Sequence, residues 1–408
     1  MKDAMSLSNM SRPAIQPSRR LSNFLIGFEH SLEQRAIELR SQGHDVINLS
    51  EVNPDLPPPA QAQEMLIRFI TAPSPSRSSS SVFDLRATIS RWYQHRFRAS
   101  IDPANELMTI PTVEQGLCDL LLALINPGDT VLVPDPCRPL FRFALALADA
   151  RAIQLPLRPE HDFLPDLKTI PDEDLECARL ILLDYPNFPT GATAPASFLH
   201  QLIRFAHEHR LLIVRLADYS EYTFEGNRTM SLIEIPGARS VTVELHSLAM
   251  NLQLRSWPLA VAIGHVDAIR HLRRYRSFVM HSLYLPIQQA IGELLIHLSP
   301  EWYAQRNALY QQRRNQLGAA LEGAGLRSWH ARALPALWVA TPPGTSSMEV
   351  AEQLLEQAHL LVAPGTVFGE RGEGYLLFSV TIDNSRLEEV VHRLSRVQFK
   401  PSSLETNR

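Results

Sequence analysis

Residues 241–264 read VTVELHSLAMNLQLRSWPLAVAIG and contain two short runs of β-branched and other apolar residues, VTVEL and LAVAIG. Runs of this kind, separated by polar residues, predict two buried strands. His246 and Ser247 directly follow the first run, so we expect them to form a polar turn. The loop between the two runs contains Met250 and no lysine.

Composition limits the class of protein. The chain has 408 residues, 45% of them hydrophobic, and a formal net charge of −4, which predicts one large or two moderate globular domains. Mild acidity favours neither nucleic acid nor an anionic membrane as a partner. No apolar run approaches the length of a membrane span, and residues 1–20 lack the apolar segment of a secretory signal. Scattered cysteines without metal-ligand spacing fit a reducing cytoplasm and no metal site, at Cys118, Cys137 and Cys177.

The order of the predicted elements indicates an α/β fold. From residue 82 onward, amphipathic helical patterns alternate with short apolar runs such as 178–183 (ARLILL) and 211–217 (LLIVRLA). Strands joined by crossover helices form a mostly parallel sheet, and ligands bind at the carboxyl ends of its strands. We therefore expect functional residues in the segments that directly follow these runs.

Several turn motifs carry a resemblance to a known family. They are NPD at 53–55, NPGD at 126–129, DYPNFPTG at 184–191, YSEYTF at 219–224 and a Pro-Gly and Phe-Gly pair at 364–369. The chain resembles class I/II (fold type I) aminotransferases that depend on pyridoxal phosphate (PLP), particularly the alanine and LL-diaminopimelate aminotransferase-like members. The resemblance covers essentially the whole chain. It implies a large domain with a mostly parallel sheet flanked by helices, and a smaller α+β domain.

The same resemblance implies the domain boundaries. We expect a mobile N-terminal arm at residues 1–20, followed by a helix and strand at 21–55 that belong with the small domain. The large α/β domain should span 56–285 and the C-terminal small domain 286–400, with a polar tail at 401–408.

The lysine segment departs from the family pattern. In the family, H-S-L-S-K supplies the lysine that forms a Schiff base with PLP and then moves the substrate proton, and an arginine eight residues later binds the phosphate. These two positions are Met250 and Pro258 here. The chain contains three lysines, Lys2, Lys168 and Lys400. None lies close enough in sequence to replace the missing one, so covalent PLP binding is not expected.

Other positions that would touch the cofactor or substrate are also changed. Leu216 stands where the family has the aspartate that binds the pyridine nitrogen, Phe188 replaces the asparagine at the 3′-oxygen, and Arg138 replaces the aromatic residue that stacks on the ring. Thr112 and Val113 replace the Gly-Ser pair of the phosphate loop. Ser76 replaces the tyrosine from the partner subunit, and Leu377 replaces the carboxylate arginine. The glycines near the substrate become Ser50 and Val52, whereas Tyr219 and Ser247 match the family. Because the scaffold turns are intact, the pattern predicts a retained fold whose pocket is filled with apolar side chains.

These departures lead to a functional expectation and two alternatives. We expect a protein inactive as a transaminase, with no cofactor, that acts by association as a homodimer or as a heterodimer with a related or pathway enzyme. One alternative is a PLP-independent enzyme or small-molecule binder whose remodelled cavity uses Glu114, Arg138, Asp218, Tyr219 and Arg255. The other is a PLP-dependent aminotransferase of an amino-acid pathway. Asp218 lies two residues from Leu216 and would replace the lost aspartate only through a local shift.

Overall fold

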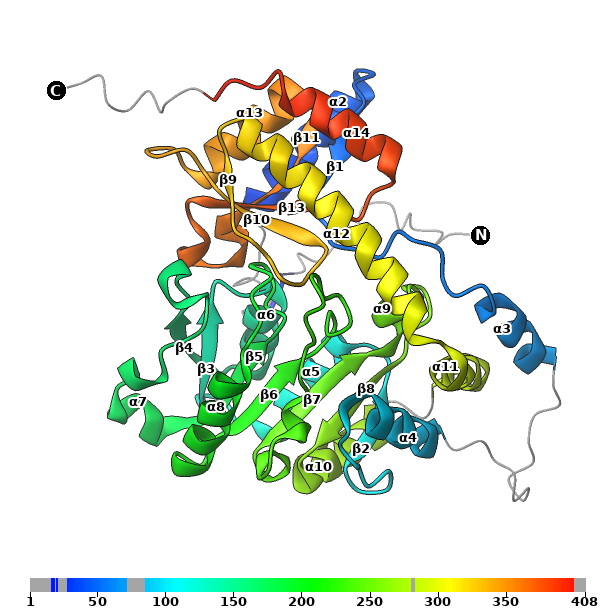
Figure 1. Cartoon of the computed structure of the whole chain (residues 1–408). Helices are drawn as coiled ribbons and strands as arrows, with labels where there is room; N and C mark the ends of the chain where they lie inside the picture. Colours follow the sequence, from blue (N-terminus) through cyan, green and yellow to red (C-terminus); the bar gives the residue numbers. More distant parts are fainter. Residues whose placement is uncertain (1–15, 19, 21–27, 72–84, 280–282, 400–408) are drawn as a thin grey trace, which may run out of the picture.

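A larger and a smaller lobe make up the computed structural model, which describes residues 16–18, 20, 28–71, 85–279 and 283–399 (Figure 1). Most of the predicted arm, Ser76 and the polar tail lie outside the described residues. The domain boundaries given above remain predictions.

The large lobe is built on one sheet, which has seven strands in the described part of the chain. Their order is β2-β8-β7-β6-β5-β3-β4, and β8 runs antiparallel to both of its neighbours. The other neighbouring pairs are parallel, which confirms the predicted sheet. The strand bounds are β2 Leu107–Ile110, β3 Thr130–Asp135, β4 Arg151–Pro156, β5 Ala178–Asp184, β6 Leu212–Leu216, β7 Thr242–Ser247 and β8 Ala260–Gly264.

Apolar side chains of the central strands pack on both faces of this sheet. In β5, Leu180 and Leu182 belong to the core that includes residues of α5, α6 and α10, whereas Ile181 and Leu183 belong to the core that includes α8. Successive side chains of a strand point to opposite faces, so a strand covered on both sides is apolar throughout. The helices around the sheet are α4 Leu85–Phe97, α5 Val113–Leu124, α6 Pro139–Ala148, α7 Asp172–Cys177, α8 Ala196–Glu208, α10 Val266–Val279 and α11 Leu285–His297.

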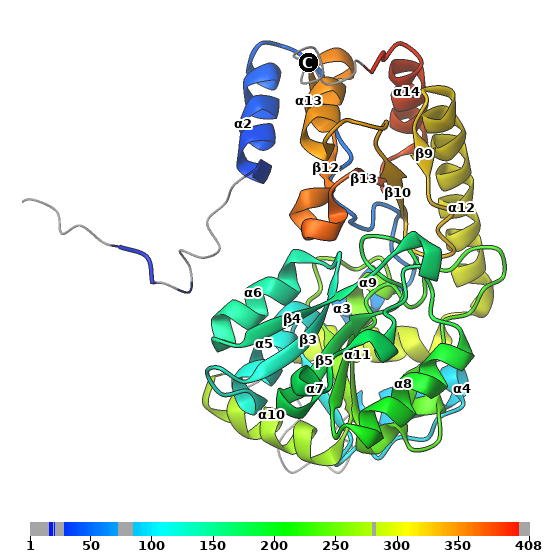
Figure 2. The same cartoon turned by 90° about the vertical axis from the view of Figure 1, so that its left-hand side faces the viewer.

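The small lobe combines the C-terminal part of the chain with an N-terminal segment. Its larger sheet has the order β12-β13-β10-β9, and β1 pairs with β11 in parallel through Ile47 and Leu360. Figure 2 shows α2 beside α13. The elements are α2 Phe28–Ser41, β1 Ile47–Asn48, α12 Pro300–Gly323, β9 Arg327–Ser328, β10 Ala336–Ala340, α13 Ser347–Ala358, β11 Leu360–Leu361, β12 Ala363–Pro364, β13 Tyr375–Ser379 and α14 Asn384–Leu394.

Shorter elements connect these layers. Helix α3 spans Ala62–Thr71 and α9 spans Leu248–Asn251. The 3₁₀ turns are η2 Pro159–His161, η3 Leu167–Thr169, η4 Leu232–Glu234, η5 Ala238–Ser240, η6 Gly365–Phe368 and η7 Glu370–Gly372.

The stretch 241–264 forms strands β7 and β8, as predicted, with α9 between them. The expected polar turn is wrong, because His246 and Ser247 are the last residues of β7 and pair with β8. Ser247 then caps α9, where its Oγ accepts a hydrogen bond from Met250 N at 3.1 Å. Gly264 ends β8 at φ 141°, where a Cβ atom would lie 2.0 Å from the Thr242 carbonyl oxygen, so only glycine fits there.

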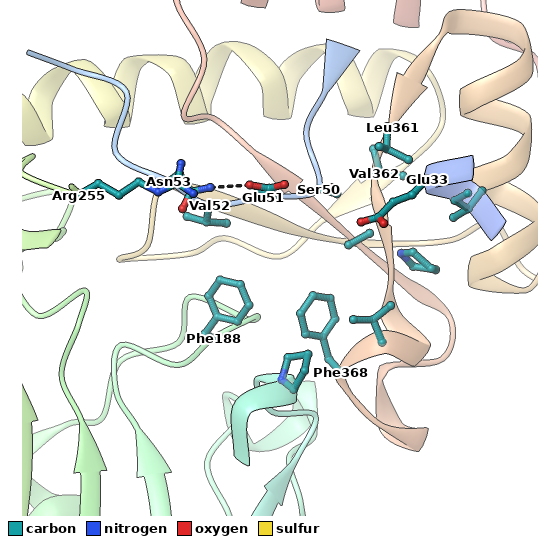
Figure 3. Close-up of a pocket in the computed structure, with 15 residues that line it drawn as sticks. Glu33, Ser50, Glu51, Val52, Asn53, Phe188, Arg255, Leu361, Val362 and Phe368 are labelled. Carbon is teal, nitrogen blue, oxygen red and sulfur yellow. Dashed lines mark hydrogen bonds between the residues drawn. The ribbon is translucent and has the colours of Figure 1, made fainter. Parts of the chain in front are cut away.

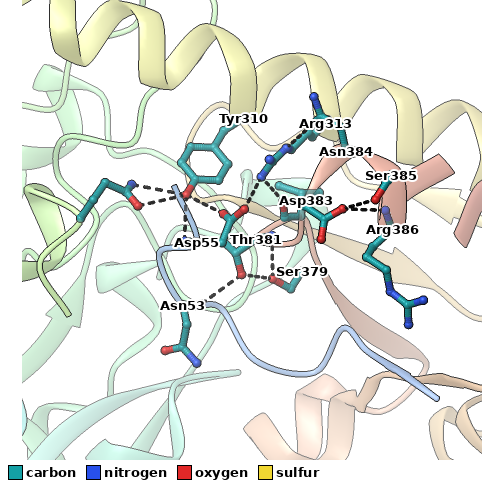
Figure 4. A network of polar contacts seen from close by, with 12 residues as sticks. Asn53, Asp55, Tyr310, Arg313, Ser379, Thr381, Asp383, Asn384, Ser385 and Arg386 are labelled. Atoms are coloured by element: carbon teal, nitrogen blue, oxygen red, sulfur yellow. Dashed lines mark hydrogen bonds and ion pairs between the residues drawn. The ribbon is translucent and has the colours of Figure 1, made fainter. Parts of the chain in front are cut away.

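Figure 4 shows the polar contacts that attach the NPD turn to the long helix α12 and the small lobe. Arg313 Nη1 lies 2.7 Å from Asp55 Oδ2, and its Nε lies 2.8 Å from Asn384 Oδ1. The Tyr310 hydroxyl donates to Asp55 Oδ1 at 2.9 Å. These bonds hold residues 53–55, which lead into the space between the lobes.

Replacing Arg313 with methionine should lower the free energy of unfolding by about 1–3 kcal/mol, because Asp55 and Asn384 would lose a charged donor whose own side chain is nearly buried. Urea denaturation measures the change. The exposed Arg270, paired with Asp267 at 2.7 Å, is the control, and Arg270→Met should cost no more than about 0.5 kcal/mol. Equal effects of the two substitutions would contradict the structural role of Arg313.

Candidate functional site

Several of the positions singled out in the sequence lie at one edge of the large sheet. Arg138 follows β3, Phe188 follows β5, Asp218 follows β6, and Met250 follows β7 in α9. Thr112 caps α5 after β2, and its Oγ1 accepts a hydrogen bond from Gln115 N at 3.2 Å. Because the carboxyl ends of parallel strands share one edge, residues far apart in sequence face one another here.

The centre of this edge is a buried ionic cluster. Arg138 Nε lies 3.1 Å from Asp184 Oδ2, and Arg138 Nη1 lies 2.7 Å from Asp218 Oδ2. Asp184 also accepts hydrogen bonds from Asn187 Nδ2 and the Phe188 amide. Asp218 Oδ1 is buried and has no hydrogen-bond partner among the described residues. Two carboxylates therefore share one guanidinium where solvent is excluded.

Burial dominates the titration of this cluster. It raises the pKa of Asp218 to about 6 although the positive charge of Arg138 acts in the opposite direction. Burial also raises the pKa of Asp184. For Arg138, burial disfavours the charged form, but the carboxylates of Asp218 and Asp184 outweigh it and raise the pKa, so the guanidinium stays charged.

Aromatic rings cover the cluster. The Phe188 ring stacks on Tyr219 with centroids 6.0 Å apart and an angle of 17° between the planes. The Arg138 guanidinium carbon lies 5.5 Å from the Phe188 centroid, within cation–π range. The Tyr219 hydroxyl donates to the Val52 carbonyl oxygen at 2.9 Å. Phe188 thus separates the ionic cluster from the space between the lobes.

The remaining departures from the family pattern add no charged group to this edge. Val113, Leu216 and Leu377 are at most 1% exposed and belong to the apolar cores. Met250 is partly buried against one of these cores, and its carbonyl oxygen accepts a hydrogen bond from the Tyr222 hydroxyl at 2.6 Å. Pro258 is exposed.

Above Phe188 lies a cavity of about 380 Å³ between the lobes, lined by Leu32, Glu33, Ser50, Glu51, Val52, Asn53, Pro139, Phe188, Arg255, Leu361, Val362, Ala363, Pro364, Val367 and Phe368. Figure 3 shows Phe188 and Phe368 on one side of it and the segment 50–53 on the other. Arg255 is exposed and has no hydrogen bond or ion pair within the described residues. We refer to this space as the interlobe pocket.

The structure divides the five residues of the suggested polar site. Arg138, Asp218 and Tyr219 meet, but mainly as partners of one another and of the backbone. Arg255 instead lines the interlobe pocket. Glu114 is exposed on α5 and acts on the cluster through its charge, which raises the pKa of Asp218.

Sequence reasoning missed three acidic residues of this region. Asp184 begins the DYPNFPTG motif, where the family pattern has asparagine, and that exchange was the available signal. Glu51 lies between the two replaced glycine positions. Glu33 belongs to α2, and only the folded chain brings it to the pocket. Groups of three or more acidic, histidine or cysteine residues able to hold a metal ion are not found in the described ranges.

Comparison with known proteins identifies the family. The model of "Aminotransferase class I and II" matches residues 44–394. The chain belongs to the class I and II aminotransferase family. It is 35% identical to the LL-diaminopimelate aminotransferase of Syntrophobacter fumaroxidans, over 90% of this chain and 95% of that protein. It is 33% identical to the L-glutamine–4-(methylsulfanyl)-2-oxobutanoate aminotransferase of Bacillus subtilis, over 91% and 94% respectively.

Solved structures show the same aminotransferase fold. Substrate-bound BacF from Bacillus subtilis superposes with a TM-score of 0.86 at 29% identity, over 94% of this chain and 97% of the other. A probable N-succinyldiaminopimelate aminotransferase from Thermus thermophilus superposes with a TM-score of 0.84 at 28% identity, over 90% and 99%. These matches confirm fold type I.

The comparisons contradict two expectations drawn from the sequence. The leading expectation, a transaminase-inactive protein that acts by association, is wrong, because relatives at 31–35% identity over most of the chain are named as LL-diaminopimelate aminotransferases. The expectation of no cofactor is wrong for the same reason, since aminotransferases of this family use PLP. Family membership therefore favours the aminotransferase alternative.

The side chains at this aminotransferase site do not match the group that the family implies. A Schiff base needs an amine, and residue 250 supplies a thioether. Of the lysines, Lys168 is exposed in η3 and does not line the interlobe pocket, and the other two lie outside the described residues. Leu216 offers no carboxylate to a ring nitrogen, and Arg138 already serves two carboxylates.

Asp218 should make stability depend on pH. Its pKa is about 6 in the folded chain against about 4 when unfolded, so the folded state binds the proton more tightly and stability falls as pH rises from about 4 to 6. The Asp218→Asn substitution removes this titratable carboxyl group. The stability of the variant relative to the parent should therefore rise between pH 4 and pH 7 by on the order of 1–3 kcal/mol.

Denaturant titrations at several pH values measure this difference. Asp184 is present in both proteins, so the comparison isolates the change at Asp218. The exposed Glu64→Gln variant serves as the control and should follow the parent closely. Parallel pH curves for the parent and Asp218→Asn would show that Asp218 is not held at a raised pKa.

Proposed function

We propose that this aminotransferase-family protein binds an amino acid or its 2-oxo acid in the interlobe pocket, without a covalent bond at residue 250. The observation that carries the proposal is the pocket itself. A cavity of about 380 Å³ is lined by the exposed cation of Arg255 and by two aromatic rings, Phe188 and Phe368. A carboxylate could form two parallel hydrogen bonds with this guanidinium.

The relatives support this class of ligand. Their names specify amino-acid substrates, diaminopimelate in one group and glutamine with a 2-oxo acid in another. The pocket lies at the strand ends where open α/β sheets bind ligands. The family's carboxylate arginine corresponds to Leu377, so the ligand needs another cationic partner. Arg255 is the cation among the residues that line the pocket.

Transamination is the second candidate, and family membership is the observation that favours it. An active enzyme would need an amine or another base in place of Met250. Asp218 does not serve readily as that base because it lies behind Phe188 in an ion pair with Arg138.

We also propose that the chain forms a homodimer, as family members commonly do. Large apolar side chains are exposed at the end of α10 and the start of α11, where Phe278, Val279 and Tyr284 are 81%, 56% and 59% exposed. A second copy that covers these side chains would remove them from water.

Location in the cytoplasm remains a prediction. No helix among the described residues has the length and apolar character needed to span a membrane.

Thermal unfolding with a panel of amino acids and 2-oxo acids tests the leading proposal. A ligand at about 100 times its dissociation constant should raise Tm by about 3 °C for a chain of this length. Arg255→Gln should reduce the shift, whereas the exposed Arg270→Gln, far from the pocket lining, should not. Failure of every compound to move the Tm of the parent protein would overturn the proposal.

Absorbance between 300 and 500 nm after addition of PLP, with and without borohydride, distinguishes the second candidate. We expect no borohydride-trapped adduct within the pocket of the parent protein. A trapped adduct should form only in the Met250→Lys variant, if the new lysine restores the amine. A trapped adduct in the parent, together with turnover in a coupled transaminase assay, would establish transamination and identify the lysine that replaces residue 250.

A further inference from the structure

Most of the charged side chains that line the interlobe pocket are acidic. The charged residues that line the pocket are Glu33, Glu51 and Arg255, two carboxylates and one guanidinium. The ionic cluster below Phe188 adds two carboxylates for one guanidinium. Both layers therefore favour a ligand of net positive charge.

Glu51 is held on a well-anchored segment. Leu49 N donates to the Leu361 carbonyl oxygen at 2.7 Å, and Asn53 N donates to Thr381 Oγ1 at 3.1 Å. The Glu51 side chain accepts one hydrogen bond, from Asn53 Nδ2 at 2.7 Å to Oε2. A carboxylate has about four acceptor positions, so Glu51 can still accept hydrogen bonds from a ligand ammonium group.

Glu33 provides a second carboxylate at the opposite end of the pocket from Arg255. Figure 3 shows Arg255 and Glu33 at the two ends of the labelled row, with Asn53 and Glu51 between them. Helix α2 presents Glu33 while the neighbouring Leu32 is buried in the core. Glu33 is exposed and forms no hydrogen bond or ion pair in the described part of the chain.

Apolar surface lies along the same row. Phe188 and Phe368 make an edge-on contact with ring centroids 5.7 Å apart, and Leu361 and Val362 continue the wall toward Glu33. Such a wall suits a short methylene chain, and each buried methylene contributes about 0.8 kcal/mol in general. The pocket thus offers one cationic end, an apolar wall, and acidic groups in the middle and at the other end.

We propose that the interlobe pocket binds a basic amino acid of the lysine or ornithine class. Arg255 binds the α-carboxylate, Glu51 binds the α-ammonium group, the methylene chain lies on the aromatic wall, and Glu33 binds the terminal ammonium group. The assignment rests on the proposed amino-acid binding and specifies its substrate class. A dicarboxylic ligand would place its second carboxylate near Glu33, and a diamine without a carboxylate would leave Arg255 unpaired.

Isothermal titration calorimetry with the full chain tests the assignment. The probes are L-lysine, L-ornithine, L-norleucine, L-glutamate and cadaverine, which differ in charge but little in length. We expect L-lysine or L-ornithine to bind at least about tenfold more tightly than L-norleucine, L-glutamate or cadaverine, since each of these lacks one of the charge pairs.

Single substitutions assign the two ends. Glu33→Gln should weaken lysine binding about 3- to 30-fold and leave norleucine binding unchanged, because norleucine has no terminal ammonium group. Arg255→Gln should weaken the binding of both lysine and norleucine and leave that of cadaverine unchanged. Glu64→Gln, an exposed acid on α3 outside the pocket lining, is the matched control and should change none of these affinities. All of these side chains are exposed, so the variants should fold.

The outcomes separate this inference from the proposed function. If norleucine or glutamate binds as tightly as lysine, or Glu33→Gln leaves the preference for lysine intact, the basic class is wrong although amino-acid binding stands. If a folded parent protein binds none of the amino acids, both proposals fail.

Discussion

The ion pairs of Arg138 with Asp184 and Asp218 determine what the rest of the site can do. Moving these charges out of water costs several kcal/mol for each ion, and mutual attraction offsets that cost only while all three groups remain together. Burial raises the pKa of Asp218, and its Oδ1 atom has no hydrogen-bond partner in the part of the chain that the structure describes. The cluster thereby occupies the strand ends with protein charges, and Phe188 covers it. The interlobe pocket lies above this layer.

The sheet makes this arrangement possible. Arg138, Asp184 and Asp218 follow or end β3, β5 and β6, which are neighbours in the parallel part of the sheet. Parallel strands deliver their carboxyl ends to one edge, so three polar residues separated by up to 80 positions meet. The second lobe completes the pocket, because β1 and β11 pair and bring residues 50–53 over the same edge. The network around Asp55 and Arg313 fixes the end of that segment.

Family membership and the local chemistry point in different directions. The chain shares its fold and about a third of its residues with named aminotransferases, yet residue 250, where the resemblance predicts the reactive amine, is a methionine. A fold can persist while its site changes, because the packing of core residues and the chemistry of a few site residues are separate requirements. Binding of an amino acid needs only complementary charges and an apolar wall, and both are present between the lobes.

The sequence by itself determined the fold, and it predicted which site positions are changed. Alternating apolar runs and intact turns predicted the parallel sheet, and Met250, Leu216 and Phe188 marked the changed positions, because strand periodicity and turn motifs are local properties. It did not determine function: the inference from lost residues to a protein acting by association was contradicted by the relatives. Tertiary structure alone decided that Arg138 pairs with Asp184 and Asp218, that His246 and Ser247 end a strand, and that Glu33 faces Arg255 across the pocket. Those contacts depend on which strands become neighbours and how the lobes meet, which short-range patterns do not encode.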